Sequence, residues 1–156
     1  MALEIIESTP ELEPGTWDTV WPGDTAVDHD ATDVEKWLEH GEMNGIVLNG
    51  NDKPTKITCR RLEPDEQRYI GGLLIDGNSG KALVAIRAFQ IGVMKIDGLK
   101  WVAEERAGVQ MMPRKMLNRL MKEEMLLVRT IDGKEKEIPR TLPEAIGEHI
   151  FDRSFR

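Results

Sequence analysis

An acidic cluster with one histidine lies near the start of the chain and offers ligands that divalent cations accept. It consists of Asp24, Asp28, His29, Asp30 and Asp33. Its spacing departs from an EF-hand loop, which needs a glycine at its sixth position and a glutamate at its twelfth. The other histidines, His40 and His149, have no paired zinc-ligand spacing. We therefore predict no metal site, and interpret the cluster as a solvated acidic segment in which Asp33 caps a helix.

The single cysteine, Cys59, is the next candidate for chemistry because Arg60 and Arg61 follow it. Nearby positive charge lowers the pKa of a thiol and makes it more nucleophilic. Side chains alternate along a strand, however, so the adjacent arginine points to the opposite face, and no histidine lies nearby in sequence to act as a base. The interpretation that follows is a buried core thiol.

The segment GNSGKA around Lys81 has part of the appearance of a phosphate-binding loop. That motif requires a glycine five residues before its Gly-Lys pair and a Ser or Thr after it, but Ile75 and Ala82 stand at those positions. Neither this segment nor any Ser/His/Asp order or metal framework supplies a catalytic centre. We therefore predict no catalytic residues and no cofactor, and interpret the protein as non-enzymatic.

The charge of the 156-residue chain, −7 in total, is divided unevenly along its length. Residues 1–45 hold twelve acidic residues and one lysine, whereas the remainder holds twenty basic and sixteen acidic residues. Such asymmetry is typical of an interaction arm, and its sign argues against contact between the arm and nucleic acid. The chain begins without a basic leader, lacks an apolar run of the ~20 residues that a membrane span needs, and has no cysteine pair for a disulfide. These features predict synthesis in a reducing cytoplasm and no membrane contact.

Prolines and glycines interrupt the first thirty residues, which predicts an extended acidic arm over residues 1–33, followed by a single α+β domain over residues 34–156. Within this arm, Trp17, Val20 and Trp21 are large apolar residues that need a surface to pack on. We predict that they dock on a neighbouring subunit; the alternative is that they pack onto the chain's own body. Met111 and Met112 belong to a methionine-rich stretch that suits either a core or an adaptable contact surface, and are added to the predicted partner-binding residues.

The elements expected in the body are about four helices and one or two β-hairpins. A short helix over 34–40 follows Asp33, and longer helices are expected over 64–75, 79–95 (capped by Ser79), 113–128 and from Thr141 onward. The hairpins are expected over 45–62 and 93–102, and a turn at Asp132-Gly133 precedes a charged strand. The helix over 79–95 has the clearest apolar face and is predicted to form the spine of the core. The pair Gly71-Gly72 indicates close backbone packing or a kink.

The patterns KPTKITCRRLEPDEQ and KALVAIRAFQIGVMKIDGLKW in residues 53–101, together with LPEAIGEHIF in 142–151, resemble small structural and assembly proteins of tailed bacteriophages. These include virion accessory proteins and tail-assembly chaperones. The resemblance implies a non-enzymatic part in virion construction, with other virion or assembly proteins, or copies of the chain itself, as partners. It also implies the host cytoplasm at synthesis and the virion as the destination of a structural component.

Three hypotheses follow from these observations. The first is a virion structural or assembly protein whose arm docks on a neighbouring subunit. The second is a regulatory protein or tail-assembly chaperone that binds a host or phage protein through the acidic arm and is absent from the virion. The third is an enzyme whose site is assembled from scattered residues.

Overall fold

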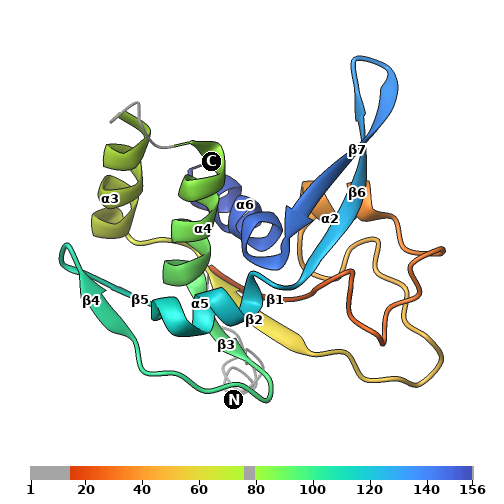
Figure 1. Cartoon of the computed structure of the whole chain (residues 1–156), viewed down its shortest axis with the longest axis horizontal. Coiled ribbons are helices and arrows are strands. Elements are labelled where there is room, and N and C mark those ends of the chain that lie inside the picture. Colours follow the sequence, from red (N-terminus) through yellow and green to blue (C-terminus); the bar gives the residue numbers. More distant parts are fainter. Residues whose placement is uncertain (1–14, 76–79, 156) are drawn as a thin grey trace, which may run out of the picture.

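A computed structural model describes residues 15–75 and 80–155, which form a mixed α+β fold (Figure 1). A three-stranded antiparallel sheet lies beside a pair of packed helices, α4 and α6, and two separate hairpins, β4–β5 and β6–β7, extend from this centre. The hairpin β6–β7 projects well beyond the rest of the chain in this view. The α+β class expected from the sequence is thus confirmed.

The central sheet has the order β1-β2-β3 and joins segments that are far apart in sequence. Its strands are β1 (Thr16–Val20), β2 (Lys56–Arg60) and β3 (Val93–Ile96). Ile57 and Cys59 of β2 are buried on one face, as the alternation of the strand predicts. The hairpin expected over 45–62 is wrong: β2 pairs with β1 and β3 instead, and the earlier half of that segment contributes only an isolated bridge, Val27 to Leu48.

The segment 15–33 is part of the folded core, which corrects the predicted boundary after residue 33. Its strand β1 pairs with β2 in a five-residue register from Thr16 opposite Arg60 to Val20 opposite Lys56. Three apolar residues of this segment, Trp17, Val20 and Trp21, are buried. The apolar area that they remove from water explains why this acidic segment is held against the body. Residues 1–14 of the expected arm lie outside the described residues.

Tryptophan side chains connect this N-terminal segment to helices α2 (Val34–His40) and α6 (Leu142–Ser154). The Trp37 indole Nε1 donates a hydrogen bond to Thr19 Oγ1 at 2.9 Å, and the rings of Trp21 and Trp37 meet edge to face, 6.2 Å apart. The guanidinium of Arg153 lies 4.0 Å from the centre of the Trp17 ring. The predicted cap of α2 is confirmed, since the Asp33 side chain accepts a hydrogen bond from the Lys36 backbone N–H.

Helices α4 (Lys81–Gly92) and α6 pack closely against each other at Gly147. A Cβ atom at Gly147 would lie 1.9 Å from the Ala85 carbonyl oxygen, so only glycine fits this crossing. Phe89 and Gln90 are buried, as expected for the spine of the core, while Leu83 and Ile86 are only half-buried. Helix α4 ends at Gly92, earlier than predicted, because β3 begins there; Ser79, its predicted cap, lies outside the described residues.

The predicted helix over 113–128 is corrected to a shorter helix followed by a strand. Helix α5 spans Arg114–Leu120, and β6 (Glu124–Ile131) then pairs with β7 (Lys134–Thr141) along its whole length. A turn at Asp132 and Gly133 joins them, with positive φ angles of 53° and 77° that suit a type I′ hairpin turn. The predicted turn is confirmed. The predicted cap of α6 is also confirmed, since Thr141 and Glu144 form a reciprocal capping box.

Helix α3 (Pro64–Ile75) begins at the predicted proline and is tied to the sheet through Glu66. Both Glu66 carboxylate oxygens accept hydrogen bonds from the Arg60 guanidinium at 2.7 Å. Gly71 and Gly72 lie within the unbroken helix with open space where a Cβ would stand, so the predicted close packing at this pair is wrong. The hairpin expected over 93–102 reduces to a turn with one bridge, from Ile96 to Leu99, and is followed by the small hairpin of β4 (Glu104–Arg106) and β5 (Val109–Met111).

Candidate protein-binding surface

The five residues predicted to bind a partner are all buried in the chain's own core. Trp17, Val20, Trp21, Met111 and Met112 are at most 4% exposed. Burial of this degree corresponds to intramolecular packing, and a partner has no access to these side chains in the folded chain. Any contact of the folded chain with another protein would therefore involve other residues.

The acidic cluster supports the local backbone. Asp28 Oδ1 accepts hydrogen bonds from the backbone N–H groups of Asp30 and Ala31, and Asp24 Oδ2 accepts one from Thr55 at 2.9 Å. With Asp33 capping α2, three of the four carboxylates of the cluster thus hold turns or a helix end. Within residues 15–75 and 80–155, no group of three or more His, Cys, Asp or Glu side chains is arranged to hold a metal ion.

Cys59 is fully buried, which confirms its interpretation as a core thiol. Burial raises the pKa of the Cys59 thiol far above its ordinary value; the negative charge of Asp18 acts in the same direction and Arg153 acts against it. A thiol in this state is protonated at neutral pH and is a poor nucleophile. The imidazole of His149 is also buried and packs edge-on against Trp37 at 4.4 Å. The structure therefore places these two groups in the packing of the core.

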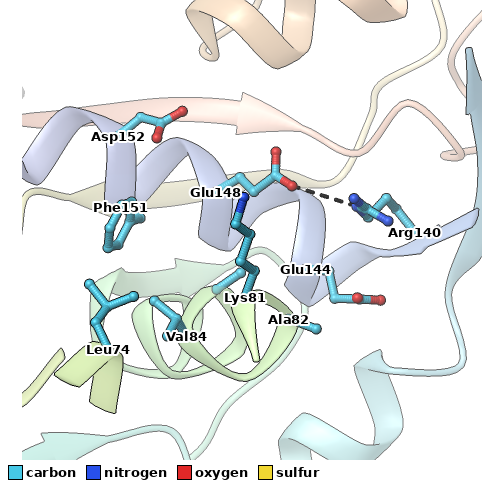
Figure 2. Close-up of a pocket in the computed structure, with 10 residues that line it drawn as sticks. Leu74, Lys81, Ala82, Val84, Arg140, Glu144, Glu148, Phe151 and Asp152 are labelled. Carbon is cyan, nitrogen blue, oxygen red and sulfur yellow. Dashed lines mark ion pairs between the residues drawn. The ribbon is translucent and has the colours of Figure 1, made fainter. Parts of the chain in front are cut away.

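A groove of about 580 Å³ runs between α4 and α6, near the end of α3 (Figure 2). Leu74, Val84 and Phe151 form its apolar part, and charged residues surround them. Figure 2 shows Lys81 extending from α4 toward Glu148, which also pairs with Arg140 at 3.5 Å. The Glu144 side chain takes part in the capping box of α6, where it accepts a hydrogen bond from the Thr141 backbone N–H. The charges around the groove thus largely satisfy one another, and they leave no clear preference for one sign of ligand.

Three acidic residues along α6, Glu144, Glu148 and Asp152, line one side of this groove. Their four-residue spacing is visible in the sequence and puts them on one helix face. Sequence reasoning did not single them out, because a charged stripe is the ordinary appearance of a solvated helix.

The β6–β7 hairpin exposes large apolar side chains on an element that extends away from the core (Figure 1). The exposed fractions are 56% for Leu126, 44% for Val128 and 36% for Ile131. Pro139 stands opposite Leu126 in the register and is also exposed. Leu126, Val128 and Pro139 therefore form a small apolar patch on one face of the hairpin.

The register of the hairpin sorts its charged residues between its two faces. Glu137 stands opposite Val128, and Glu135 opposite Thr130, so both glutamates share the face of the apolar patch. We call this the acidic face; it comprises Leu126, Val128, Thr130, Glu135, Glu137 and Pro139. Lys134, opposite Ile131, and Lys136 occupy the other side. We call this the basic face; it comprises Ile131, Lys134 and Lys136, all exposed.

The root of the hairpin is fixed to the body. Leu127 is 1% exposed and belongs to the hydrophobic core, while Leu142 at the start of α6 donates a backbone hydrogen bond to the Glu123 carbonyl at 2.7 Å. Further out, the Thr130 backbone N–H donates to Glu35 Oε1 of α2 at 2.9 Å. The two faces are therefore presented by a hairpin that is anchored at its root and braced along β6.

Comparison with models of protein families, with curated proteins and with solved structures found no match to this chain. In the part of the chain that the structure describes, no helix is long and apolar enough to cross a membrane. Inference about what the chain does therefore rests on its own surface and sequence.

Proposed function

We propose that this protein is a non-enzymatic component of tailed-phage virion construction, and that it acts by binding another protein subunit through the β6–β7 hairpin. The observation that carries the binding role is the apolar patch of Leu126, Val128 and Pro139 on this projecting element. The phage context is supported by the sequence resemblance over residues 53–101 and 142–151.

The face of the hairpin is better suited to binding than its open edge. Strand edges that must not pair with other chains commonly carry proline, lysine and alternating charges. The strand β7 has Pro139 and the alternating run Lys134 to Glu137, which discourage the addition of a further strand. Fully burying a leucine or valine side chain contributes ~1.5–3 kcal/mol, so Leu126 and Val128 together offer a useful part of a binding free energy.

The test is incorporation into particles. Mass spectrometry of virions purified from cells that produce this protein should detect the wild-type chain, and Leu126→Ser combined with Val128→Ser should reduce its amount at least tenfold. Met94→Ser is the matched control, because Met94 is 49% exposed on β3, outside the hairpin. Thermal melts of the purified variants show that each is folded.

Two results would overturn the proposal. Incorporation of the folded hairpin variant at the wild-type level would remove the hairpin from the binding role. A wild-type chain that is absent from particles, yet bound to a virion protein before assembly, would favour the chaperone alternative over a structural component.

A further inference from the structure

We infer that the partner of the β6–β7 hairpin is a second copy of this chain, packed with the acidic face of one hairpin against the basic face of the next. This inference rests on the proposed function, because it takes the hairpin as the binding element. It goes further in assigning the occupant and the geometry of the contact.

The first support is that the two faces are complementary to each other. Glu135 and Glu137 lie on one face with Leu126 and Val128, whereas Lys134 and Lys136 lie on the other with Ile131. Each face thus combines charge of a single sign with exposed apolar surface. Two identical chains can satisfy both requirements at once by packing unlike faces together.

The second support is that stability of the hairpin alone does not explain this sorting. Opposite charges on residues that stand directly opposite each other stabilise a pair of strands, whereas like charges at such positions destabilise it. Here the register sets Val128 and Thr130 opposite the two glutamates, and sets Ile131 opposite Lys134. None of these cross-strand pairs joins a lysine to a glutamate.

The third support comes from symmetry. A two-fold contact brings like face to like face, which opposes glutamates to glutamates or lysines to lysines. Two chains could also pair their β7 edges as antiparallel strands about a two-fold axis. Residues that then stand opposite each other are an even number of sequence positions apart, so like charges meet, such as Lys134 with Lys136 or Glu135 with Glu137. Both symmetric arrangements are therefore disfavoured. The contact is head-to-tail, which builds a ring if the rotation closes and a filament if it does not.

The expected contact is weak for a single pair of chains. An eight-residue hairpin is about 27 Å long at ~3.4 Å per residue, but Leu127, on the same side as the basic face, is buried in the core, so only about the outer half of that side is free. A free length of about 14 Å and a width of about 10 Å give roughly 140 Å² on each partner. This is well below the ~800 Å² per partner of a standard interface, so the contact belongs to the weak, transient class. Self-association must therefore be measured at high protein concentration.

The experiment is sedimentation velocity of the full chain at concentrations up to about 1 mM and at low salt. The wild-type chain should show a weight-average sedimentation coefficient that rises with concentration and falls again when salt is added, because salt screens the contact. Glu135→Lys with Glu137→Lys makes both faces basic, and Lys134→Glu with Lys136→Glu makes both acidic. Each variant alone should sediment as a monomer, and an equimolar mixture of the two should associate.

Matched controls change the same amount of charge elsewhere. Glu104→Lys with Glu105→Lys on β4, and Lys115→Glu with Lys122→Glu in and after α5, alter exposed residues outside the hairpin and should leave self-association unchanged. A wild-type chain that stays monomeric throughout, or hairpin variants that each associate alone as the wild type does, would overturn the inference. If the monomeric wild type still enters particles through its hairpin, the proposed function stands and only the choice of partner is wrong.

Discussion

Replacing Gly147 with alanine should destabilise the protein, although the same change stabilises most helices. Alanine is favoured over glycine in a helix interior by about 0.8–1 kcal/mol. At Gly147, however, the new Cβ would lie 1.9 Å from the Ala85 carbonyl oxygen and 2.6 Å from its carbonyl carbon. Real Cβ atoms essentially never approach within 3.0 Å of a non-bonded heavy atom of another element, so α4 and α6 must separate by about 1 Å or more at this point.

The size of the effect follows from setting these two contributions against each other. Overpacking of a core costs about 1–3 kcal/mol, and the upper end applies here because the clash involves backbone atoms that cannot rotate away. Subtracting the helical preference leaves a net loss of about 2 kcal/mol. For a chain of this length, that loss lowers the melting temperature by roughly 4–8 °C.

Urea and thermal unfolding followed by circular dichroism measure this change, and Gly72→Ala provides the control. Gly72 lies in α3 with no atom within 4 Å of the position that the alanine methyl group would take, so its replacement should raise the free energy of unfolding by about 0.5–1 kcal/mol. Opposite signs for the two variants are the expected result. A Gly147→Ala protein as stable as the wild type would show that α4 and α6 do not cross as closely as these distances require.

Three further predictions concern the core. Arg60→Met alone or Glu66→Leu alone should lower the free energy of unfolding by about 2–3 kcal/mol. This is less than the ~3–5 kcal/mol lost when a fully buried ion pair is broken, because the Arg60 side chain is 25% exposed. The double variant should have a free energy of unfolding closer to that of the wild type than either single variant has. Trp37→Phe removes the hydrogen bond to Thr19 and should lower the free energy of unfolding by about 1–3 kcal/mol, measured by urea titration. Burial raises the pKa of Cys59 above its ordinary value of 9.0. This thiol should therefore not affect the free energy of unfolding below pH 9.0, and should lower it above that pH as the unfolded thiol ionises. Unfolding of Cys59→Ala, measured as a function of pH, should lack this part of the decline.

Features set by neighbouring residues were predictable from the sequence. The caps at Asp33 and Thr141, the helix start at Pro64 and the turn at Asp132-Gly133 depend on one to four adjacent residues, and all appear as expected. The central sheet was not predictable in this way, because β2 finds its partners about forty residues away on either side. The helix predicted over 113–128 is wrong after Leu120 because the apolar residues there fit either periodicity, and only pairing with β7 selects the strand.

Only part of the candidate surface could be predicted from the sequence. The alternating Lys134–Glu137 run predicts a solvent-exposed strand, but its charge sorting becomes meaningful only once β6 is placed opposite in a defined register. The predicted docking of Trp17 and Trp21 on a neighbouring subunit depended on a similar gap in the sequence evidence. An acidic, proline-rich composition suggests a free arm, whereas the apolar area of Trp17 and Trp21 and the contact of Trp17 with Arg153 hold the segment against α6.

The contacts between the first half of the chain and α6 have a consequence for how the protein forms during synthesis. Arg153 pairs with Glu42 at 3.0 Å, and the Leu62 backbone N–H donates to Ser154 Oγ at 2.9 Å, so early parts of the chain depend on residues translated about a hundred positions later. The apolar face of β1 has no α6 to pack on until that helix leaves the ribosome. Packing of β1 is therefore expected to wait until α6 has been synthesised, with the tryptophans accessible to chaperones on the nascent chain in the meantime.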